Sequence, residues 1–95
     1  SNMVKTVFSR KEALLWCWKN IRHKYNCIRY DVVQSYISKI ITDELLNMGF
    51  ITSMWNERRM YSEYYLTDLG KRYCEDLFFT INFVIFTYRD KLIDE

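Results

Sequence analysis

The side chains that could perform covalent or acid-base chemistry are few and widely separated in this chain. His23 is the only histidine, and it follows a basic segment where it would cap a helix or contact a phosphate. The three cysteines, Cys17, Cys27 and Cys74, do not have the spacing of a metal site. No nucleophile, base and orienting group can be assembled, and the sequence has no glycine-rich phosphate loop. The sequence therefore predicts a protein that is not an enzyme and that uses no cofactor or metal.

The other reactive groups have ordinary structural explanations. Two of the cysteines follow helical apolar patterns and are expected in the core, which leaves redox sensing as a minor alternative. Glu75 and Asp76 follow Lys71 and Arg72 by four residues each, so we expect two salt pairs on a helix surface. An odd number of distant cysteines fits reduced thiols, and we therefore expect a cytoplasmic protein.

Positive charge is concentrated in the first half of the chain. Residues 1–42 carry eight basic and two acidic side chains, whereas residues 43–95 carry six basic and ten acidic ones. Arg58 and Arg59 add a basic pair within the second half. A polyanion such as nucleic acid would be attracted to the first half and to this pair, although a solvated surface can show the same pattern.

The composition indicates one ordered domain. Its 95 residues are 49% hydrophobic and 18% aromatic and include no proline, which argues against disorder. Residues 1–3 are typical of a tag remnant and the start, residues 4–67 would form the main domain, and residues 68–95 a helix packed on it. The apolar run 77–88 is shorter than the roughly 20 residues that span a bilayer, so we expect no contact with a membrane.

Apolar periodicity and capping residues predict the order of the elements. Ser9 and Glu12 form a capping-box pattern ahead of the first helix. Gly49 favours a left-handed helix stop, and tyrosine-rich residues before Thr67 favour a strand. We expect helices at 10–24, 30–36, 37–48 and 68–93, a short strand at 27–29, and a hairpin at 50–66. Four apolar side chains at the hairpin tip are expected to pack across it or brace it against the body: Met54, Trp55, Met60 and Tyr61.

The segment from the third helix to the start of the last one carries a recognisable pattern. It reads LxxxGxI, then the hairpin, then YxLTxxG, with matching residues Leu45, Gly49, Ile51, Tyr64, Leu66, Thr67 and Gly70. In this pattern the chain resembles the winged helix-turn-helix regulators, particularly small MarR-like and PadR-like proteins. The resemblance implies an α+β, mainly α fold with a two- or three-stranded wing and a long C-terminal helix. It also implies a transcription regulator, in the first place a repressor, that binds double-stranded DNA as a homodimer.

The resemblance makes residues 37–48 the recognition helix, with its N-terminal residues against base edges. Its core side would then hold Ile37, Ile40, Ile41, Leu45 and Met48. Base contacts would come from Ser38, Lys39 and Thr42, positioning contacts from Gln34, Tyr36, Arg29 and Lys24, and the wing contact from Arg58 and Arg59. The sequence departs from the family at 30–36, which is short and lacks the usual turn glycine, and the acidic pair Asp43–Glu44 disfavours strong nonspecific binding.

The last helix is longer than a domain of this size needs, and it has two apolar faces. A two-fold related copy is the commonest cover for a second apolar face, so we expect a homodimer. The predicted dimer interface contains Leu15, Trp16, Phe79, Phe83 and Phe86. The alternative is that these aromatic side chains all belong to the intramolecular core.

Two other functions stay open at this point. The first is a winged helix that serves as a protein-protein interaction module without DNA binding, with Asp43 and Glu44 facing the partner. The second is a ligand-responsive sensor with an aromatic pocket between the first and last helices. That pocket would contain Trp18, Tyr73 and Phe78, but the sequence does not indicate a small-molecule effector.

Overall fold

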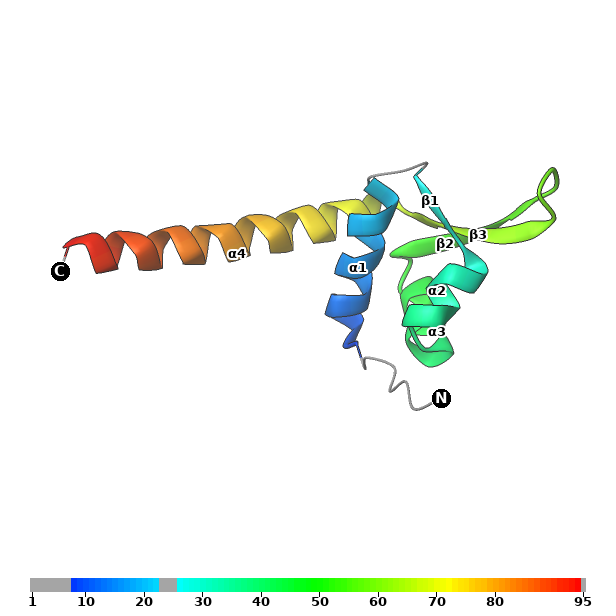
Figure 1. Cartoon of the computed structure of the whole chain (residues 1–95), viewed down its shortest axis with the longest axis horizontal. Helices are drawn as coiled ribbons and strands as arrows, with labels where there is room; N and C mark the ends of the chain where they lie inside the picture. The colour runs from blue at the N-terminus through cyan, green and yellow to red at the C-terminus, as the bar shows by residue number, and fades with distance from the viewer. Residues whose placement is uncertain (1–7, 23–25, 95) are drawn as a thin grey trace.

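Figure 1 shows the computed structural model, an α+β arrangement that is mostly helical and includes a three-stranded antiparallel sheet. The structure describes residues 8–22 and 26–94, and the side chains of residues 8–21 and 26–81. In chain order the elements are α1 (Arg10–Arg22), β1 (Cys27–Arg29), α2 (Tyr30–Tyr36), α3 (Lys39–Asn47), β2 (Ile51–Asn56), β3 (Tyr61–Leu66) and α4 (Asp68–Asp94). This order confirms the predicted succession of helices and strands.

The predicted capping box begins α1. The backbone N–H of Ser9 donates to Glu12 Oε1 and the backbone N–H of Glu12 donates to Ser9 Oγ, both at 3.2 Å. These bonds satisfy two donors that the first turn of a helix otherwise leaves unpaired. From this start, Leu14, Cys17 and Ile21 recur at helical spacing and are all buried.

The sheet has the order β1-β3-β2, so the central strand β3 pairs with both of its neighbours. Side chains alternate along β3, and Tyr64 and Leu66 point to the core face, where both are buried. Glu63 and Tyr65 therefore point to the outer face. The core lies between the inner face of the sheet, helices α1, α2 and α3, and the first turns of α4. Its buried members are Ala13, Leu14, Cys17, Ile21, Ile28, Val33, Ile37, Leu45, Ile51, Tyr64, Leu66 and Cys74.

The third helix is shorter than predicted and is rotated relative to the prediction. Ile37 is buried but lies outside the helix with an extended backbone (φ −119°, ψ 135°). The prediction takes Ile37 as the first core position of the helix, so it assigns the wrong side of α3 to the core. Ile40, predicted in the core, is 72% exposed, and Thr42, predicted on the outer face, is 1% exposed. The prediction for Met48 is also wrong, because this side chain is exposed rather than buried.

The junction between the hairpin and α4 explains the LTxxG part of the pattern. Thr67 Oγ1 donates to the carbonyl oxygens of Gly49 (2.6 Å) and Phe50 (3.1 Å), and it accepts from the backbone N–H of Gly70 at 3.0 Å. A Cβ added to Gly70 would lie 2.1 Å from the Phe50 carbonyl oxygen. Gly49 has φ +78°, which confirms the predicted left-handed helix stop. The end of α3, the start of β2 and the start of α4 are therefore held in one hydrogen-bonded corner.

Helix α4 and the β2–β3 hairpin project from opposite ends of the molecule (Figure 1). Helix α4 has 27 residues, which corresponds to about 40 Å, and the longest dimension of the chain is 58 Å. The salt pairs expected on α4 are wrong, because the ion pairs within the described side chains are Arg10–Glu44 and Arg29–Asp31. The expected packing of the hairpin tip is also wrong for Met54, Trp55 and Met60, each more than half exposed.

Candidate nucleic-acid interface

A two-residue connection joins α2 to α3 and fixes the start of α3. Ser38 is the N-cap of α3, and its Oγ accepts a hydrogen bond from the backbone N–H of Ile41 at 3.2 Å. The side chain predicted to read a base therefore also stabilises the start of the helix. Lys39 is the first residue of α3 and is exposed. The exposed N-terminus of α3 thus presents one cation beside backbone N–H groups, an arrangement that suits an anionic partner.

Thr42 cannot contact an external ligand in this structure. Its hydroxyl donates to the carbonyl oxygen of Ser38 at 2.9 Å and accepts from Gln34 Nε2 at 3.5 Å. Burial raises the pKa of the Tyr64 phenol, and its interaction with the Gln34 side chain partly offsets this effect. Both predicted contact residues therefore belong to a polar contact between α2 and α3, which satisfies the buried hydroxyl.

The outward face of α3 consists of other residues. Ile40, Asp43 and Asn47 are exposed and lie three or four positions apart, so they share one side of the helix with Lys39 at its edge. Glu44 is turned toward α1, where one of its oxygens lies 3.5 Å from Arg10 Nε. The side chains that this face offers for contact are therefore those of Lys39, Ile40, Asp43 and Asn47.

Two predicted positioning residues already have intramolecular partners. The ring of Tyr36 lies 5.1 Å from that of Trp16, although Tyr36 is more than half exposed. The guanidinium of Arg29 lies 2.8 Å from Asp31 Oδ2 and 4.6 Å from the ring centroid of Tyr61. Both pairs are at the surface, so a phosphate could compete for Arg29 at modest cost. The predicted Lys24 lies outside the described residues.

Arg58 and Arg59 lie in the turn between β2 and β3, as predicted, and both are exposed. The turn is closed by Asn56, whose carbonyl oxygen accepts from the backbone N–H of Met60 at 2.8 Å. Asn56 Oδ1 also accepts from the backbone N–H of Arg59 at 3.0 Å. The tip is therefore an ordered turn in which the direction of each side chain is set by the backbone.

The outer face of the sheet holds a buried carboxylate that the sequence did not reveal. Glu63 is 6% exposed, and its oxygens accept from the Cys27 thiol and from the Asn56 amide, both at 2.5 Å. It lies in a hollow of about 510 Å³ that Arg59 and Tyr65 also line. The alternation of β3 places Glu63 on the face opposite to Tyr64 and Leu66, and this pattern by itself predicts a solvated carboxylate.

Titration of this cluster follows from its hydrogen bonds. The bonds from Cys27 and Asn56 lower the pKa of Glu63, and the positive charge of Arg59 adds to this effect. Burial raises the pKa of Cys27, and its contact with Glu63 raises it further. Cys27 is therefore a protonated thiol that donates to an ionised carboxylate, and it is not an activated nucleophile.

The predicted dimer residues do not form one surface within the chain. Leu15 and Trp16 are partly buried against the core, whereas Phe79 is 73% exposed on α4. Phe78 and Ile81 are also exposed on this helix. The side chains of Phe83 and Phe86 lie outside the described residues. The described part of α4 therefore presents apolar side chains that the rest of the described chain does not cover.

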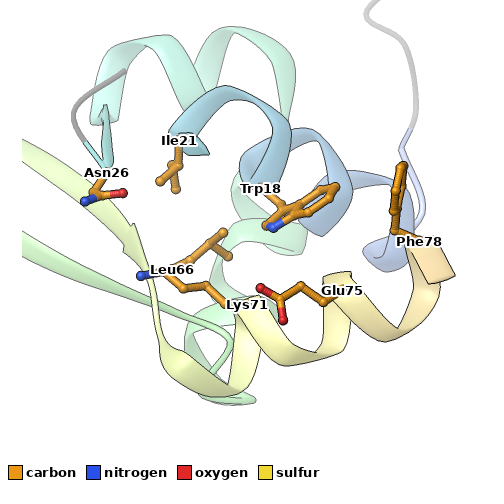
Figure 2. A pocket seen from close by; sticks show the side chains of 7 residues that line it. All are labelled: Trp18, Ile21, Asn26, Leu66, Lys71, Glu75 and Phe78. Carbon is orange, nitrogen blue, oxygen red and sulfur yellow. The ribbon is translucent and has the colours of Figure 1, made fainter. Parts of the chain in front are cut away.

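A cavity of about 370 Å³ separates α1 from the start of α4 (Figure 2). It is lined by Trp18, Ile21, Asn26, Leu66, Lys71, Glu75 and Phe78. The rings of Trp18 and Phe78 are 5.6 Å apart, as expected for the predicted pocket, but Tyr73 packs against Phe50 instead, at 5.0 Å. Lys71 and Glu75 bring opposite charges to one side of this cavity.

The two remaining cysteines are core residues, as predicted. Burial raises the pKa of Cys17 to about 12 and that of Cys74 to about 11. Within the described residues, no three His, Cys, Asp or Glu side chains come close enough to hold a metal ion. No helix in the described part of the chain has the length and apolar character needed to cross a membrane.

No protein family model, curated protein sequence or solved structure matches this chain.

Proposed function

We propose that this chain is a winged-helix protein that binds duplex DNA as a homodimer and regulates transcription, in the first place as a repressor. The observation that carries the proposal is the hairpin that directly follows α3 and ends in an exposed turn with Arg58 and Arg59. Figure 1 shows this hairpin extending beyond α2 and α3, on the side of the molecule away from α4. A helix with an exposed N-terminus beside a basic β-ribbon suits a major groove and the adjacent backbone or minor groove.

The exposed face of α3 suggests how bases would be read. Lys39 would donate to guanine or to a phosphate, and Asp43 would accept from the amino group of cytosine. Ile40 would contact the methyl group of thymine, which only the major groove presents. The exposed Ser38 can still donate its hydroxyl proton to DNA, whereas the hydroxyl of the buried Thr42 is engaged within the protein. A face with one cation and one carboxylate favours selective binding over strong nonspecific binding.

A second copy of the chain is the proposed partner for α4. The helix projects from the body, and its described portion exposes Phe78, Phe79 and Ile81. A two-fold axis along such a helix would cover the same residues on both copies. Dimerisation would also place two α3 helices on one duplex, which predicts a pseudo-palindromic site with half-sites one or two helical turns apart.

A second candidate function is a protein-protein interaction module. The observation that favours it is the exposure of Ile40 on the same side of α3 as Asp43, since an apolar and acidic surface suits a protein partner better than a polyanion. This function would require no affinity for nucleic acid.

Fluorescence polarisation with a random duplex of about 30 base pairs at about 50 mM salt separates the two functions. DNA binding predicts saturable polarisation that weakens as salt is raised, whereas the interaction module predicts none. Light scattering tests the dimer independently, because the chain has a mass of 11.7 kDa and the dimer twice that mass. Phe79→Glu should yield the monomer, since it places a charge in the proposed interface.

A further inference from the structure

The hairpin tip carries an apolar side chain at a position that ordinarily disfavours one. Met60 has φ +59°, in the left-handed region where glycine and asparagine are common and other side chains are strained. Its side chain is also 72% exposed. A strained backbone conformation and an exposed apolar side chain therefore occur at the same residue. Backbone strain of this kind is often found at functional sites.

The surroundings of Met60 are apolar and cationic. Met54 and Trp55 are more than half exposed, and strand alternation points them to opposite faces of the hairpin. Arg58 is exposed, and within the described part of the chain no carboxylate lies within ion-pair distance of it. The acidic Glu57 is the only carboxylate in the four-residue turn 57–60. The tip thus combines exposed apolar surface with a net positive charge.

We propose that Met60 is an apolar wedge that enters the minor groove of DNA and separates two stacked base pairs, while Arg58 contacts the flanking phosphate. This inference rests on the proposed DNA-binding function and extends it from contact with DNA to bending of DNA. Apolar side chains that enter a base step from the minor groove partly unstack it and kink the duplex toward the major groove. The unbranched thioether of methionine is narrow and adaptable, which suits such a narrow site.

The turn is built to hold this wedge in one direction. The backbone N–H of Arg59 donates to the side-chain oxygen of Asn56, and the backbone N–H of Met60 donates to the carbonyl oxygen of Asn56. These two hydrogen bonds close the turn. Little backbone freedom would be lost on binding, because the turn is already ordered. The net positive charge of the tip favours DNA over an uncharged protein surface, because it is attracted to the phosphates on either side of the minor groove.

Two variants of Met60 separate a binding role from a structural one. Met60→Gly and Met60→Asn both relieve the left-handed strain and remove the wedge, so each should raise the thermal midpoint of unfolding by a few degrees. Met60→Leu keeps an apolar side chain and serves as the matched control. The probe is a duplex of about 30 base pairs enriched from a random pool by the wild-type protein and labelled at both ends for energy transfer.

The inference predicts that wild type and Met60→Leu bend this duplex and bind it within about threefold of one another. Met60→Gly and Met60→Asn should bind it about tenfold more weakly and leave it straighter, despite their greater stability. Equal affinity and equal energy transfer for all four proteins would overturn the wedge but leave DNA binding intact. Failure of the wild type to bind any duplex would overturn the proposed function and the wedge together. Binding to phosphatidylserine vesicles that requires Met60, without an effect of Met60 on DNA, would assign the tip to a membrane surface and overturn the inference.

Discussion

Gly70→Ala should destabilise the domain because the added methyl group has no room. The new Cβ would lie 2.1 Å from the Phe50 carbonyl oxygen, 3.0 Å from the Phe50 carbonyl carbon and 3.1 Å from Leu66 Cδ2. The nearest contact is with backbone, which cannot rotate away as a side chain could. Either the start of α4 or the start of β2 must therefore move by about 1 Å to restore an ordinary contact.

The magnitude follows from what that movement breaks. The Phe50 carbonyl oxygen accepts from the backbone N–H and from the hydroxyl of Thr67, both at 3.1 Å, and each bond contributes about 1 kcal/mol. Overpacking adds roughly 1–3 kcal/mol, and the better helix propensity of alanine returns about 1 kcal/mol. We expect a net loss of roughly 2–4 kcal/mol from a total of roughly 5–14 kcal/mol for a chain of this length.

Thermal unfolding followed by circular dichroism measures this loss as a fall in the midpoint of roughly 10–30 °C. Gly49→Asn is the matched control, because Gly49 has φ +78° with no atom within 4 Å of an added Cβ, and asparagine tolerates this conformation. The control should cost under about 1 kcal/mol. A Gly70→Ala midpoint as high as that of the control would refute the close approach of α4 to β2.

Thr42→Val removes the buried hydroxyl that donates to the carbonyl of Ser38, so we expect the free energy of unfolding, measured by urea titration, to fall by about 1 kcal/mol. The affinity for DNA should stay unchanged. A selective loss of DNA affinity would return Thr42 to the proposed contact surface. Burial raises the pKa of Cys17 to about 12 and of Cys74 to about 11, from 9.0, so their stabilising contribution is present below pH 9 and is lost as the pH rises. Between pH 7 and pH 10 the wild type should therefore lose roughly 2–3 kcal/mol more of its unfolding free energy than a Cys17→Ala/Cys74→Ala variant, and parallel curves would contradict the burial of these thiols. Hydrogen bonds lower the pKa of Glu63 below 4.5, so its contribution is present above pH 4.5 and is lost on acidification; thermal midpoints between pH 7 and pH 3 should fall further for the wild type than for Glu63→Gln.

Local signals in the sequence located most of the elements. The capping box at Ser9 and Glu12, the left-handed Gly49 and the cap at Thr67 each act within a few residues, so their effect does not depend on the rest of the fold. The last helix was predicted at 68–93 and is Asp68–Asp94, because apolar residues recur along it without a proline or a glycine after the first turn.

The proposed contact surface was harder to predict because it depends on the phase of one short helix. Ile37 is buried like a helical core residue but lies in an extended connection, and this shifts every position assigned after it. The burial of Thr42 also needs Gln34 from a different helix, which periodicity within α3 cannot reveal. Glu63 was missed for a related reason, since a carboxylate in a strand is ordinarily solvated and its donors come from two other parts of the sheet.

The most direct test of DNA binding by α3 and the hairpin is the dependence of duplex affinity on salt for the wild type and for the Arg58→Ala/Arg59→Ala variant. Each phosphate contact adds about 0.9 to the slope of log affinity against log salt concentration. The proposed function predicts wild-type binding with a negative slope, and a slope for the variant that is shallower by up to about two contacts. Identical slopes would remove the hairpin tip from the interface, and a wild type without measurable affinity would contradict the account as a whole.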